Sequence, residues 1–416
     1  MTPQALMQLV RQGENSGIEF NRDDLRPEQL AREVVAFANF QGGQVLLGIE
    51  DDGTPSGLQR ADLEHWVMDT VFGRFVHPQL LPYYEEVVLE DGLRVAVVTV
   101  MPGTTKPYVV RHHQREDIYV RVGSTSRLAT REQQAALFAS GGLLHAETLP
   151  VSGSAMADLD RARLTDYLGR VLADDVPGED AGWVARLCGL GFMTERADAA
   201  PVCTIAGAVL FAHRPRRLLR QAGLRWMAFS GDDMDYQALD DTELDAPMVG
   251  LWAAGNGTLY LAQPGLIEQF MERVQLFVSV ESAQLVDHLR RDRTWNYPPD
   301  ALREAVLNAI VHRDWTRPGN VEVVLYRDRL AVTSPGALQN SMTLEKMFAG
   351  QRSARNPIIV EVMRDYGYVD QRGMGVRRKI VPLTRQYAGK DANFEAADDF
   401  VRVTLPARRG SVVGKP

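Results

Sequence analysis

Apolar positions in the first part of the chain recur at both helical and strand spacings. Leu30, Val34 and Phe37 fall on one helical face, which predicts a helix that begins at Pro27 and is broken by the glycine pair at 42–43. The run QVLLGIE at 44–50 is apolar and strand-sized, so it predicts a buried strand that closes in an Asp-Asp-Gly turn. Helices and strands therefore alternate in this region, which is typical of a compact α/β domain.

Cap and turn residues predict the other elements of this domain. Thr2-Pro3 has the form of a helix start, and Asp91-Gly92 between two apolar runs predicts a hairpin turn, because that turn favours positive φ. Thr130 with Gln133 forms a capping box that begins a helix. The further predicted elements are a helix ending near Gly13, a strand at 18–21, a helix at 60–76, hairpin strands at 83–90 and 93–100, and a strand at 117–122.

The rest of the chain changes in pattern twice. A plausible linker at 152–155 precedes a mostly helical stretch at 158–200, with strands predicted at 204–211 and 223–229. A long helix is expected from Gln284 to Tyr297-Pro298-Pro299, where a new unit begins. This unit comprises a helix at 300–312, strands at 321–326 and 330–333, a helix near 357–366, and a last strand at 400–405. We expect a mixed α/β (α+β) fold with domains at 1–146, 147–295 and 296–408, and a tail at 409–416.

Composition places the chain among globular proteins. It has 416 residues, 45% hydrophobic and 24% charged, which is enough for two or three domains with their own cores. No apolar stretch approaches the ~20 residues that span a bilayer, and the N-terminus lacks a signal-peptide pattern. Cys188 and Cys203 form neither a disulfide framework nor a zinc motif. We therefore expect a soluble cytoplasmic protein with no membrane partner.

Charge is unevenly distributed along the chain. The formal net charge is −8, yet the stretch 101–131 has six Lys or Arg against two acidic residues, a local charge of +4. A second basic run lies at 372–379. Such stretches in an acidic protein favour contact with phosphates, although they are also typical of solvated surface arginines.

Three carboxylates are candidates for a metal site. Glu14 and Glu19 flank a predicted helix-to-strand junction, and Asp51 follows the predicted strand at 44–50. Strand ends in a small sheet bring such groups together, and clustered carboxylates need a hard cation such as Mg²⁺ or Mn²⁺. The alternative is that each is a solvated residue beside a turn.

The same region resembles the Schlafen AlbA_2 domain. The resemblance covers residues 1–145 and rests on GENSGIEFN, VVAFANFQGGQVLLGIEDDGTPSGL, KPYVV and DIYVRVGSTSR. In nucleolytic Schlafens the matching carboxylates form the metal-binding site of an endoribonuclease, which implies catalytic and metal-binding roles for Glu14, Glu19 and Asp51. Asn21 departs from the pattern, because the family has a lysine there. A missing cation weakens stabilisation of the transition state.

The basic stretch belongs to this resemblance as well. Arg121, Gly123 and Ser124 can offer a guanidinium, a backbone N–H and a hydroxyl to a phosphate. Asn39, Gly42 and Gly43 also match the family and serve either that site or the turn between helix and strand. The residues expected to contact nucleic acid are Lys106, Arg111, Arg121, Ser124 and Arg127.

Near the C-terminus, Glu304, Asn308 and His312 lie at i, i+4 and i+8 of one predicted helix, so they share a face. This helix resembles the N-box of GHKL ATPases, in the HATPase_c_4-like variant that accompanies AlbA_2 domains in bacterial regulators. DRLAVTSPGAL, RSARNP and QRGMGVRR extend the resemblance over 295–407. It implies an α/β sandwich in which Glu304 polarises water and Asn308 helps to hold Mg²⁺.

The predicted nucleotide site departs from the family at the base. GHKL proteins read adenine with an aspartate, and Ser334 with Gly336 stands in that place. A hydroxyl bonds an exocyclic amine more weakly than a carboxylate does. Gly373 and Gly375 precede a basic segment and can expose N–H groups to an anion. The sequence therefore favours ATP binding without turnover, alongside a purely structural or dimerising role for this domain.

Three functions remain open from the sequence. The first is a metal-dependent endoribonuclease with a nucleotide-binding regulatory domain. The second is a non-catalytic, nucleotide-responsive regulator that binds nucleic acid, favoured by Asn21 and the net charge. The third is an ATPase or interaction module on an AlbA_2 scaffold. For the first two readings we expect RNA rather than DNA as partner, and a homo-oligomer.

Overall fold

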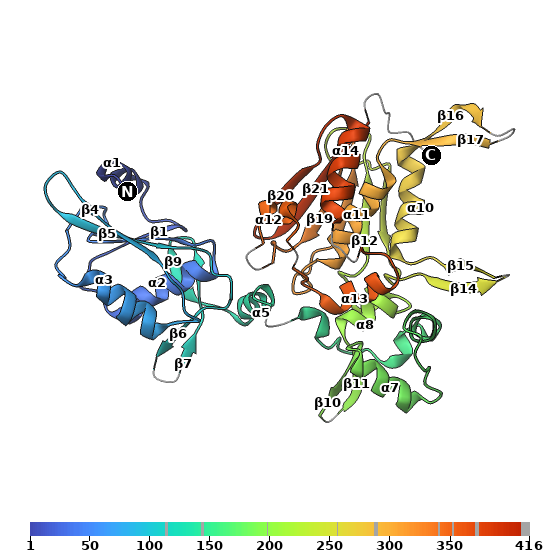
Figure 1. Cartoon of the computed structure of the whole chain (residues 1–416), viewed down its shortest axis with the longest axis horizontal. Helices are drawn as coiled ribbons and strands as arrows, with labels where there is room; N and C mark the ends of the chain where they lie inside the picture. Colours follow the sequence, from blue (N-terminus) through green and yellow to red (C-terminus); the bar gives the residue numbers. More distant parts are fainter. Residues whose placement is uncertain are drawn as a thin grey trace. The chain divides into compact units, whose positions relative to one another are not determined.

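The computed structural model describes residues 1–112, 115–142, 145–197, 199–255, 257–286, 290–339, 342–351, 353–370 and 374–408. The chain forms two compact units of mixed α/β structure (Figure 1). Unit 1 comprises Met1–Leu144 with Gln339–Ser341, and unit 2 comprises His145–Leu338 with Met342–Pro416. Among the described helices, none is long and apolar enough to cross a membrane.

A four-stranded sheet forms the centre of unit 1, in the order β1-β2-β5-β4. The first two strands are parallel and the other neighbours are antiparallel. Alternation along the strands divides the core: Val45 and Leu47 belong to the cluster that α2 covers, whereas Leu46 belongs to the cluster under α1. The four strands are β1 (Ile18–Asn21), β2 (Gly43–Leu47), β4 (Tyr83–Val88) and β5 (Arg94–Val100).

Short elements complete unit 1. The predicted capping box at Thr130 is confirmed, because Gln133 N–H donates to its hydroxyl at 3.3 Å. The predicted hairpin at Asp91-Gly92 is confirmed, but of these two residues only Gly92 has a positive φ, 84°, and the turn extends from Leu89 to Leu93. The other elements are α1 (Pro3–Gln12), α2 (Pro27–Asn39), α3 (Leu63–His65), a π-helical segment (Trp66–Phe72), α4 (Gly73–Phe75), β3 (Val76–His77), β6 (Val109–His112), β7 (Arg115–Asp117), β8 (Tyr119–Val122), β9 (Thr125–Leu128) and α5 (Arg131–Ser140).

A six-stranded sheet forms the centre of unit 2, in the order β13-β12-β18-β19-β21-β20. Helices α10, α11 and α14 form a layer on this sheet, so the architecture is a sandwich of one sheet and one helical layer (Figure 1). The elements of this sandwich are β12 (Leu224–Ala228), β13 (Asp240–Leu244), α10 (Leu266–Val278), α11 (Pro299–Val311), β18 (Val321–Leu325), β19 (Arg329–Pro335), α14 (Val381–Ala388), β20 (Asn393–Ala396) and β21 (Phe400–Pro406).

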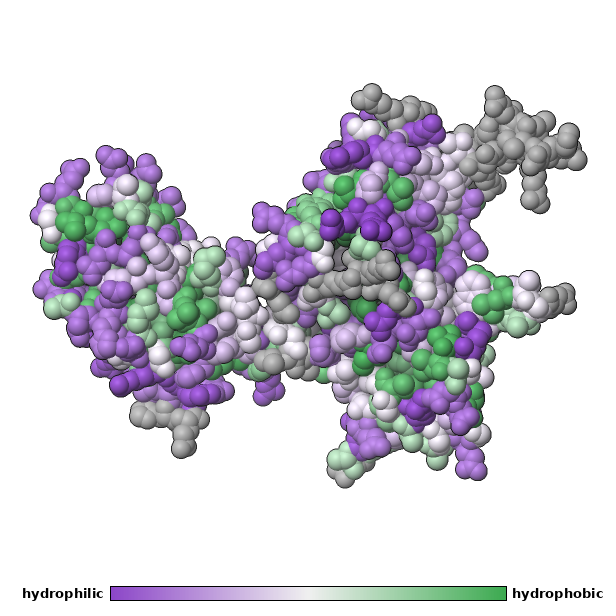
Figure 2. Space-filling view, in the orientation of Figure 1, coloured by the Kyte–Doolittle hydropathy of each residue, from purple (hydrophilic) through white to green (hydrophobic). Residues whose placement is uncertain are grey.

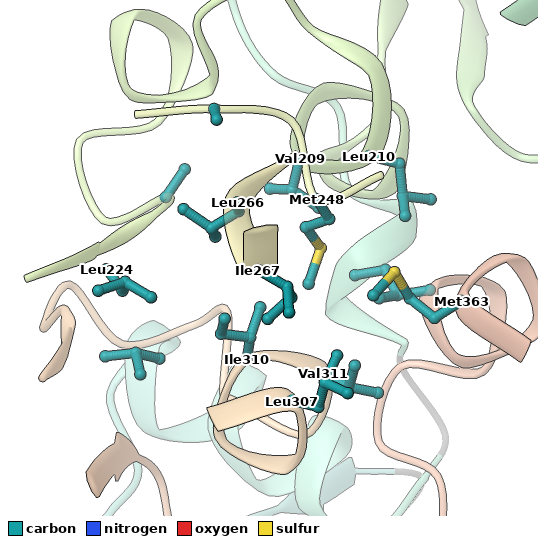
Figure 3. Close-up of a cluster of buried hydrophobic side chains, with 14 of the residues drawn as sticks. Val209, Leu210, Leu224, Met248, Leu266, Ile267, Leu307, Ile310, Val311 and Met363 are labelled. Atoms are coloured by element: carbon teal, nitrogen blue, oxygen red, sulfur yellow. The ribbon is translucent and has the colours of Figure 1, made fainter. Parts of the chain in front are cut away.

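The middle segment and the C-terminal segment share one core. Strand β12 pairs in parallel with β18, with Trp226 opposite Val323. Figure 3 shows Met248 and Ile267 of the middle segment beside Ile310 of α11 in one buried cluster. The remaining elements of unit 2 are two single-turn 3-10 helices (Ala146–Thr148 and Met156–Asp158), α6 (Arg161–Asp166), a π-helical segment (Tyr167–Val171), α7 (Asp180–Gly189), β10 (Met193–Arg196), β11 (Ala199–Cys203), α8 (Ile205–Phe211), α9 (Pro215–Leu218), β14 (Leu251–Gly255), β15 (Thr258–Gln263), β16 (Ser279–Val286), β17 (Arg290–Trp295), α12 (Leu344–Ala349), α13 (Pro357–Asp365) and a π-helical segment (Val376–Ile380).

Two predicted elements are wrong. The predicted strand at 204–211 is helix α8, which Thr204 caps by accepting from Gly207 N–H at 3.1 Å. All of its residues are buried, so neither a two-residue nor a helical period is visible in the sequence. The long helix predicted from Gln284 is instead an antiparallel pair, β16 with β17.

Candidate functional site

The predicted acidic site of unit 1 is built around a buried arginine. Glu19 lies on β1, Glu33 on α2 and Arg121 on β8, and the guanidinium lies between the two carboxylates. Arg121 Nη1 is 2.9 Å from Glu19 Oε2 and 2.9 Å from Glu33 Oε2. An internal cation therefore already compensates this carboxylate pair.

Arg121 makes further contacts that fix its position. Its Nη2 donates to the Asn15 carbonyl at 2.7 Å, its Nη1 donates to Ser126 Oγ at 3.2 Å, and its guanidinium lies 4.6 Å from the Phe37 ring centroid. The residue is only 6% exposed. The structure therefore places Arg121 in an internal network, whereas the sequence predicted a guanidinium open to phosphate.

Glu19 is electrostatically unusual. Its pKa is raised to about 7, first by desolvation and then by the negative charge of Glu33, with a smaller contribution from Glu14. The hydrogen bond and charge of Arg121 act in the opposite direction. A raised pKa in a partly buried carboxyl group marks a candidate functional position.

The three predicted metal ligands do not converge. Glu14 lies close enough to influence Glu19, and its Oε1 accepts from Phe20 N–H at 3.0 Å. Asp51 lies in an exposed turn after β2. Within the described ranges, which include all three residues, no group of three His, Cys, Asp or Glu side chains could hold a metal ion. Glu14 and Glu19 thus have Glu33 as their acidic neighbour, and Asp51 does not complete a metal site with them.

The other family-matching residues around this site have structural contacts. Asn39 donates to the carbonyls of Tyr108 and Tyr119 at 2.8 and 2.9 Å, and it accepts from Tyr108 N–H at 2.7 Å. A Cβ at Gly43 would lie 2.3 Å from the Phe37 ring, so this close approach requires glycine. The Nδ2 of Asn21 is buried, with no hydrogen-bond partner among the described atoms. Asn39 and Gly43 therefore hold α2 against the neighbouring strands.

The predicted phosphate-contacting residues differ in accessibility. Lys106 donates to the Phe40 carbonyl at 2.9 Å, and Arg111 pairs with Glu116 at 2.6 Å. Ser124 and Arg127 are exposed on the β8–β9 hairpin, where Arg127 Nε donates to Thr125 Oγ1 at 3.2 Å. Arg111 is therefore exposed but paired, whereas Ser124 and Arg127 of the hairpin are exposed without an ion pair among the described residues.

In unit 2, the face of α11 carries a polar corner. Asn308 Nδ2 donates to Glu304 Oε1 at 3.3 Å, and Lys379 Nζ lies 3.3 Å from Glu304 Oε2. A Cβ at Gly375 would lie 1.7 Å from Glu304 Oε1, so the backbone there packs directly against the carboxylate. The corner thus combines a buried carboxylate, a half-buried amide, an ammonium and a close backbone.

His312 extends this corner at the C-terminal end of α11. The residue is exposed to solvent, yet desolvation, followed by the charge of Arg355, lowers its pKa to about 4. Its imidazole is neutral at pH 7 and can donate or accept a hydrogen bond.

Ser334 does not face an open pocket. Its hydroxyl is buried and donates to the Ala309 carbonyl of α11 at 2.7 Å. Gly336 has φ 106°, and a Cβ there would lie 2.4 Å from both Arg355 Nη1 and Asp314 Cβ. The predicted base-reading hydroxyl is therefore used within the fold. Gly373 lies outside the described residues.

Sequence reasoning did not assign Glu33 or Arg355 to a site, and it noted Lys379 only as part of a basic run. Glu33 gave no signal, because a carboxylate on an amphipathic helix is ordinarily solvated. Arg355 belongs to the quoted RSARNP segment and is 6% exposed, with its Nη1 lacking a hydrogen-bond partner among the described atoms. Buried cations beside the matched motifs are therefore the feature that the sequence did not identify.

Comparisons with known proteins agree with the two resemblances. Residues 14–130 match the family model described as "Schlafen, AlbA_2", and residues 319–405 match the one described as "Putative ATP-dependent DNA helicase recG C-terminal". A search of curated proteins finds no match.

Two solved structures are similar at low identity. The crystal structure of the DIP2311 protein from Corynebacterium diphtheriae has a TM-score of 0.43 and 21% identity, covering 95% of this chain and 65% of that one. This chain thus spans less than two thirds of that protein's length. The solution structure of the N-terminal domain of a RecG-related protein from Nitrosomonas europaea has a TM-score of 0.24 and 24% identity, covering 31% of this chain and 94% of that one.

The chain therefore joins a segment that matches the Schlafen AlbA_2 family to a segment that matches the RecG C-terminal, HATPase-like family.

Proposed function

We propose that this chain is a nucleotide-responsive RNA-binding protein whose first unit binds RNA without cleaving it. The observation that carries this proposal is the position of Arg121 between Glu19 and Glu33. In a metal-dependent nuclease the clustered carboxylates would be neutralised by a divalent cation. Here a guanidinium fills that role, which favours the non-catalytic reading over the nuclease reading. Free Cys188 and Cys203 suit the reducing cytoplasm in which we place this activity.

Replacing Arg121 by a metal would be unfavourable. The guanidinium would have to leave two carboxylates, a carbonyl and a hydroxyl, all at 3.2 Å or less. Breaking a buried charge pair typically costs about 3–5 kcal/mol. Binding of a metal would have to offset this cost. One of its predicted ligands, Asp51, is far from Glu19 in the sequence and lies in an exposed turn.

The proposed RNA-binding surface comprises exposed arginines around the β8–β9 hairpin. Arg115, Arg127 and Arg131 are exposed, and none of them forms an ion pair with a carboxylate of the described residues. If each contacts one phosphate of single-stranded RNA, log K should fall with log salt with a slope of about −2. This predicted slope is modest, which agrees with an overall charge of −8.

The proposed nucleotide site is the corner formed by Glu304, Asn308, Lys379 and Gly375. The residues fit Mg²⁺ and phosphates: an amide and a carboxylate are oxygen ligands, and the ammonium is a phosphate partner. When bound, Mg²⁺ would neutralise phosphate charge there. The base-reading part does not fit, because the Ser334 hydroxyl is already used by Ala309. We therefore propose weak nucleotide binding with little base selectivity.

The experiment combines binding and cleavage on one labelled, structured RNA, with the matching DNA as comparison. We expect binding that is equal in EDTA and in Mn²⁺, with intact RNA in both. Arg127→Ala should weaken binding several-fold and reduce the salt slope by about 1. Arg11→Ala, an exposed arginine on α1, is the control and should change nothing. Tighter binding of DNA than of RNA would contradict the RNA assignment.

A metal-dependent endoribonuclease remains the second candidate. It is favoured by the proximity of Glu14 to Glu19 and by the raised pKa of Glu19, since excess negative charge there would be relieved by a divalent cation. Cleavage that requires Mn²⁺ and is abolished by Glu19→Gln, with RNA affinity retained, would establish this candidate and reject the non-catalytic one.

A further inference from the structure

A two-stranded hairpin projects from unit 2 (Figure 1). Among the described strands, β14 and β15 pair only with each other. Its root is fixed, because Gly250 N–H donates to Tyr368 Oη at 3.0 Å and Arg163 Nε donates to the Val249 carbonyl at 3.1 Å. Beyond this root the strands extend as an arm. Isolated two-stranded hairpins are marginally stable in water, so such an arm is expected to have a covering partner.

One face of the arm is apolar. The register places Trp252 opposite Leu261 and Ala254 opposite Leu259, so these four side chains share a face. Leu259 is 49% exposed. On the other face, the Tyr260 ring lies over Gly255, where a Cβ would be 3.1 Å from its Cε1. Tyr260 is itself 52% exposed, so both faces are open to solvent, but the hydroxyls of Tyr260 and Thr258 leave only the first face wholly apolar.

The arm carries no charge. Residues 246–267 contain no Asp, Glu, Lys, Arg or His, although the whole chain has a net charge of −8. Exposed strands in monomeric proteins are usually protected by charged side chains. Figure 2 shows hydrophobic colouring on this projection. A nucleic-acid partner is disfavoured, because no cation is present to meet a phosphate.

We propose that the apolar face of the β14–β15 arm is a dimerisation surface that packs against the same face of a second copy of this chain. In a two-fold contact each surface meets an identical surface, so it must be free of like charges. The arm meets this condition in a chain whose other surfaces carry net negative charge. Leu259 supplies the large exposed apolar side chain that such a contact buries, and the half-buried Trp252 lies on the same face.

The test measures the mass of the full-length protein by sedimentation equilibrium from about 1 to 100 µM. We expect a reversible monomer–dimer equilibrium. Leu259→Lys should raise the dissociation constant at least about tenfold, because it places one charge from each copy in the contact. Leu276→Lys is a matched control: Leu276 lies on α10 and is also 49% exposed, so this variant should dimerise normally.

A mixing experiment separates loss of contact from loss of folding. Leu259→Lys and Leu259→Glu should each be folded by circular dichroism and monomeric alone, and should form heterodimers when mixed. A wild-type chain that stays monomeric to about 100 µM would overturn the proposal. So would a Leu259→Lys dimer of unchanged affinity. Wild-type binding to anionic lipid vesicles by a protein that is monomeric in solution would overturn it in favour of a membrane partner.

Discussion

At the scale of single residues, Glu19 links protonation to stability. Its pKa is raised to about 7 in the folded protein, whereas an unfolded glutamate titrates near 4.5. The folded state therefore binds more protons between these values, and the free energy of unfolding should fall as pH rises from about 4.5 to 7 and then level off. A shift of this size corresponds to about 3 kcal/mol at most, and solvent screening of this partly exposed carboxyl group lowers that figure.

Glu19→Gln should remove this dependence. The free energy of unfolding of the variant minus that of the wild type should increase between pH 5 and pH 7. The measurement is urea denaturation at each pH, followed by fluorescence or circular dichroism. Glu90→Gln, an exposed carboxylate in the turn after β4, is the control outside the cluster. Parallel pH profiles for the wild type and Glu19→Gln would show that the burial and the Glu33 charge do not act on Glu19 as described.

At Gly375 the backbone packs directly against the side-chain carboxylate of Glu304. An alanine Cβ would lie 1.7 Å from the Glu304 carboxylate, so Gly375→Ala should displace that side chain. We expect a loss of about 1–3 kcal/mol in stability and loss of the Mg²⁺-dependent part of nucleotide binding. The measurement is calorimetry with nucleotide, with and without Mg²⁺.

The control for this variant is Gly189→Ala. A Cβ at Gly189, the last residue of α7, meets nothing within 4 Å, so the change should leave stability and nucleotide binding unchanged or slightly improve stability. Equal behaviour of the two alanine variants would contradict the close packing of Gly375 on Glu304.

At the scale of elements, the proposed lack of base selectivity rests on the contact between α11 and β19. Ser334 joins the two through its bond to the Ala309 carbonyl. Ser334→Asp should therefore bury a carboxylate beside a carbonyl oxygen and destabilise unit 2 by at least about 1–3 kcal/mol, rather than improve adenine recognition.

The same contact predicts that ATP and GTP bind with similar, weak affinities, from tens of micromolar to millimolar, roughly −4 to −6 kcal/mol. Asn308→Ala should lower the Mg²⁺-dependent part of both. Thermal shift with each nucleotide is the measurement, since a ligand stabilises in proportion to its excess over Kd. A strong preference for ATP over GTP would mean that another group reads the base.

The elements that the sequence predicts correctly are those with two independent signals. Helix α2 had a helical period and a proline start, and the β4–β5 hairpin had strand runs on both sides of Asp91-Gly92. The prediction for α8 was wrong because every one of its residues is buried, so its sequence has no helical alternation of apolar and polar positions. The pattern of residues 279–295 likewise did not distinguish a helix from the β16–β17 pair.

The candidate site was only half predictable for a related reason. The motifs gave Glu19, Glu304 and Asn308, since matched spacing identifies positions on one element. They did not give the pairing of Arg121 with Glu33, because that contact joins residues 88 positions apart in sequence. Long-range ion pairs leave no local pattern, and Arg121 therefore appeared to be a surface cation.

At the scale of the whole molecule, the chain forms two compact units, whereas the sequence predicted three domains. Strand β12 of the middle segment lies inside the sheet of the C-terminal segment, so the proposed nucleotide site at α11 rests on a core that both segments share. The proposed response to nucleotide therefore concerns unit 2 as a whole. Unit 1 carries the proposed RNA surface and the buried arginine cluster.

The most direct test of the account is cleavage of one structured RNA by the purified full-length protein, followed over hours in Mn²⁺ and in EDTA, with RNA binding measured in the same samples. The account predicts the same affinity in both buffers and no cleavage product in either, because the Arg121 guanidinium already lies between Glu19 and Glu33 and pairs with both. Mn²⁺-dependent cleavage that Glu19→Gln abolishes would contradict it.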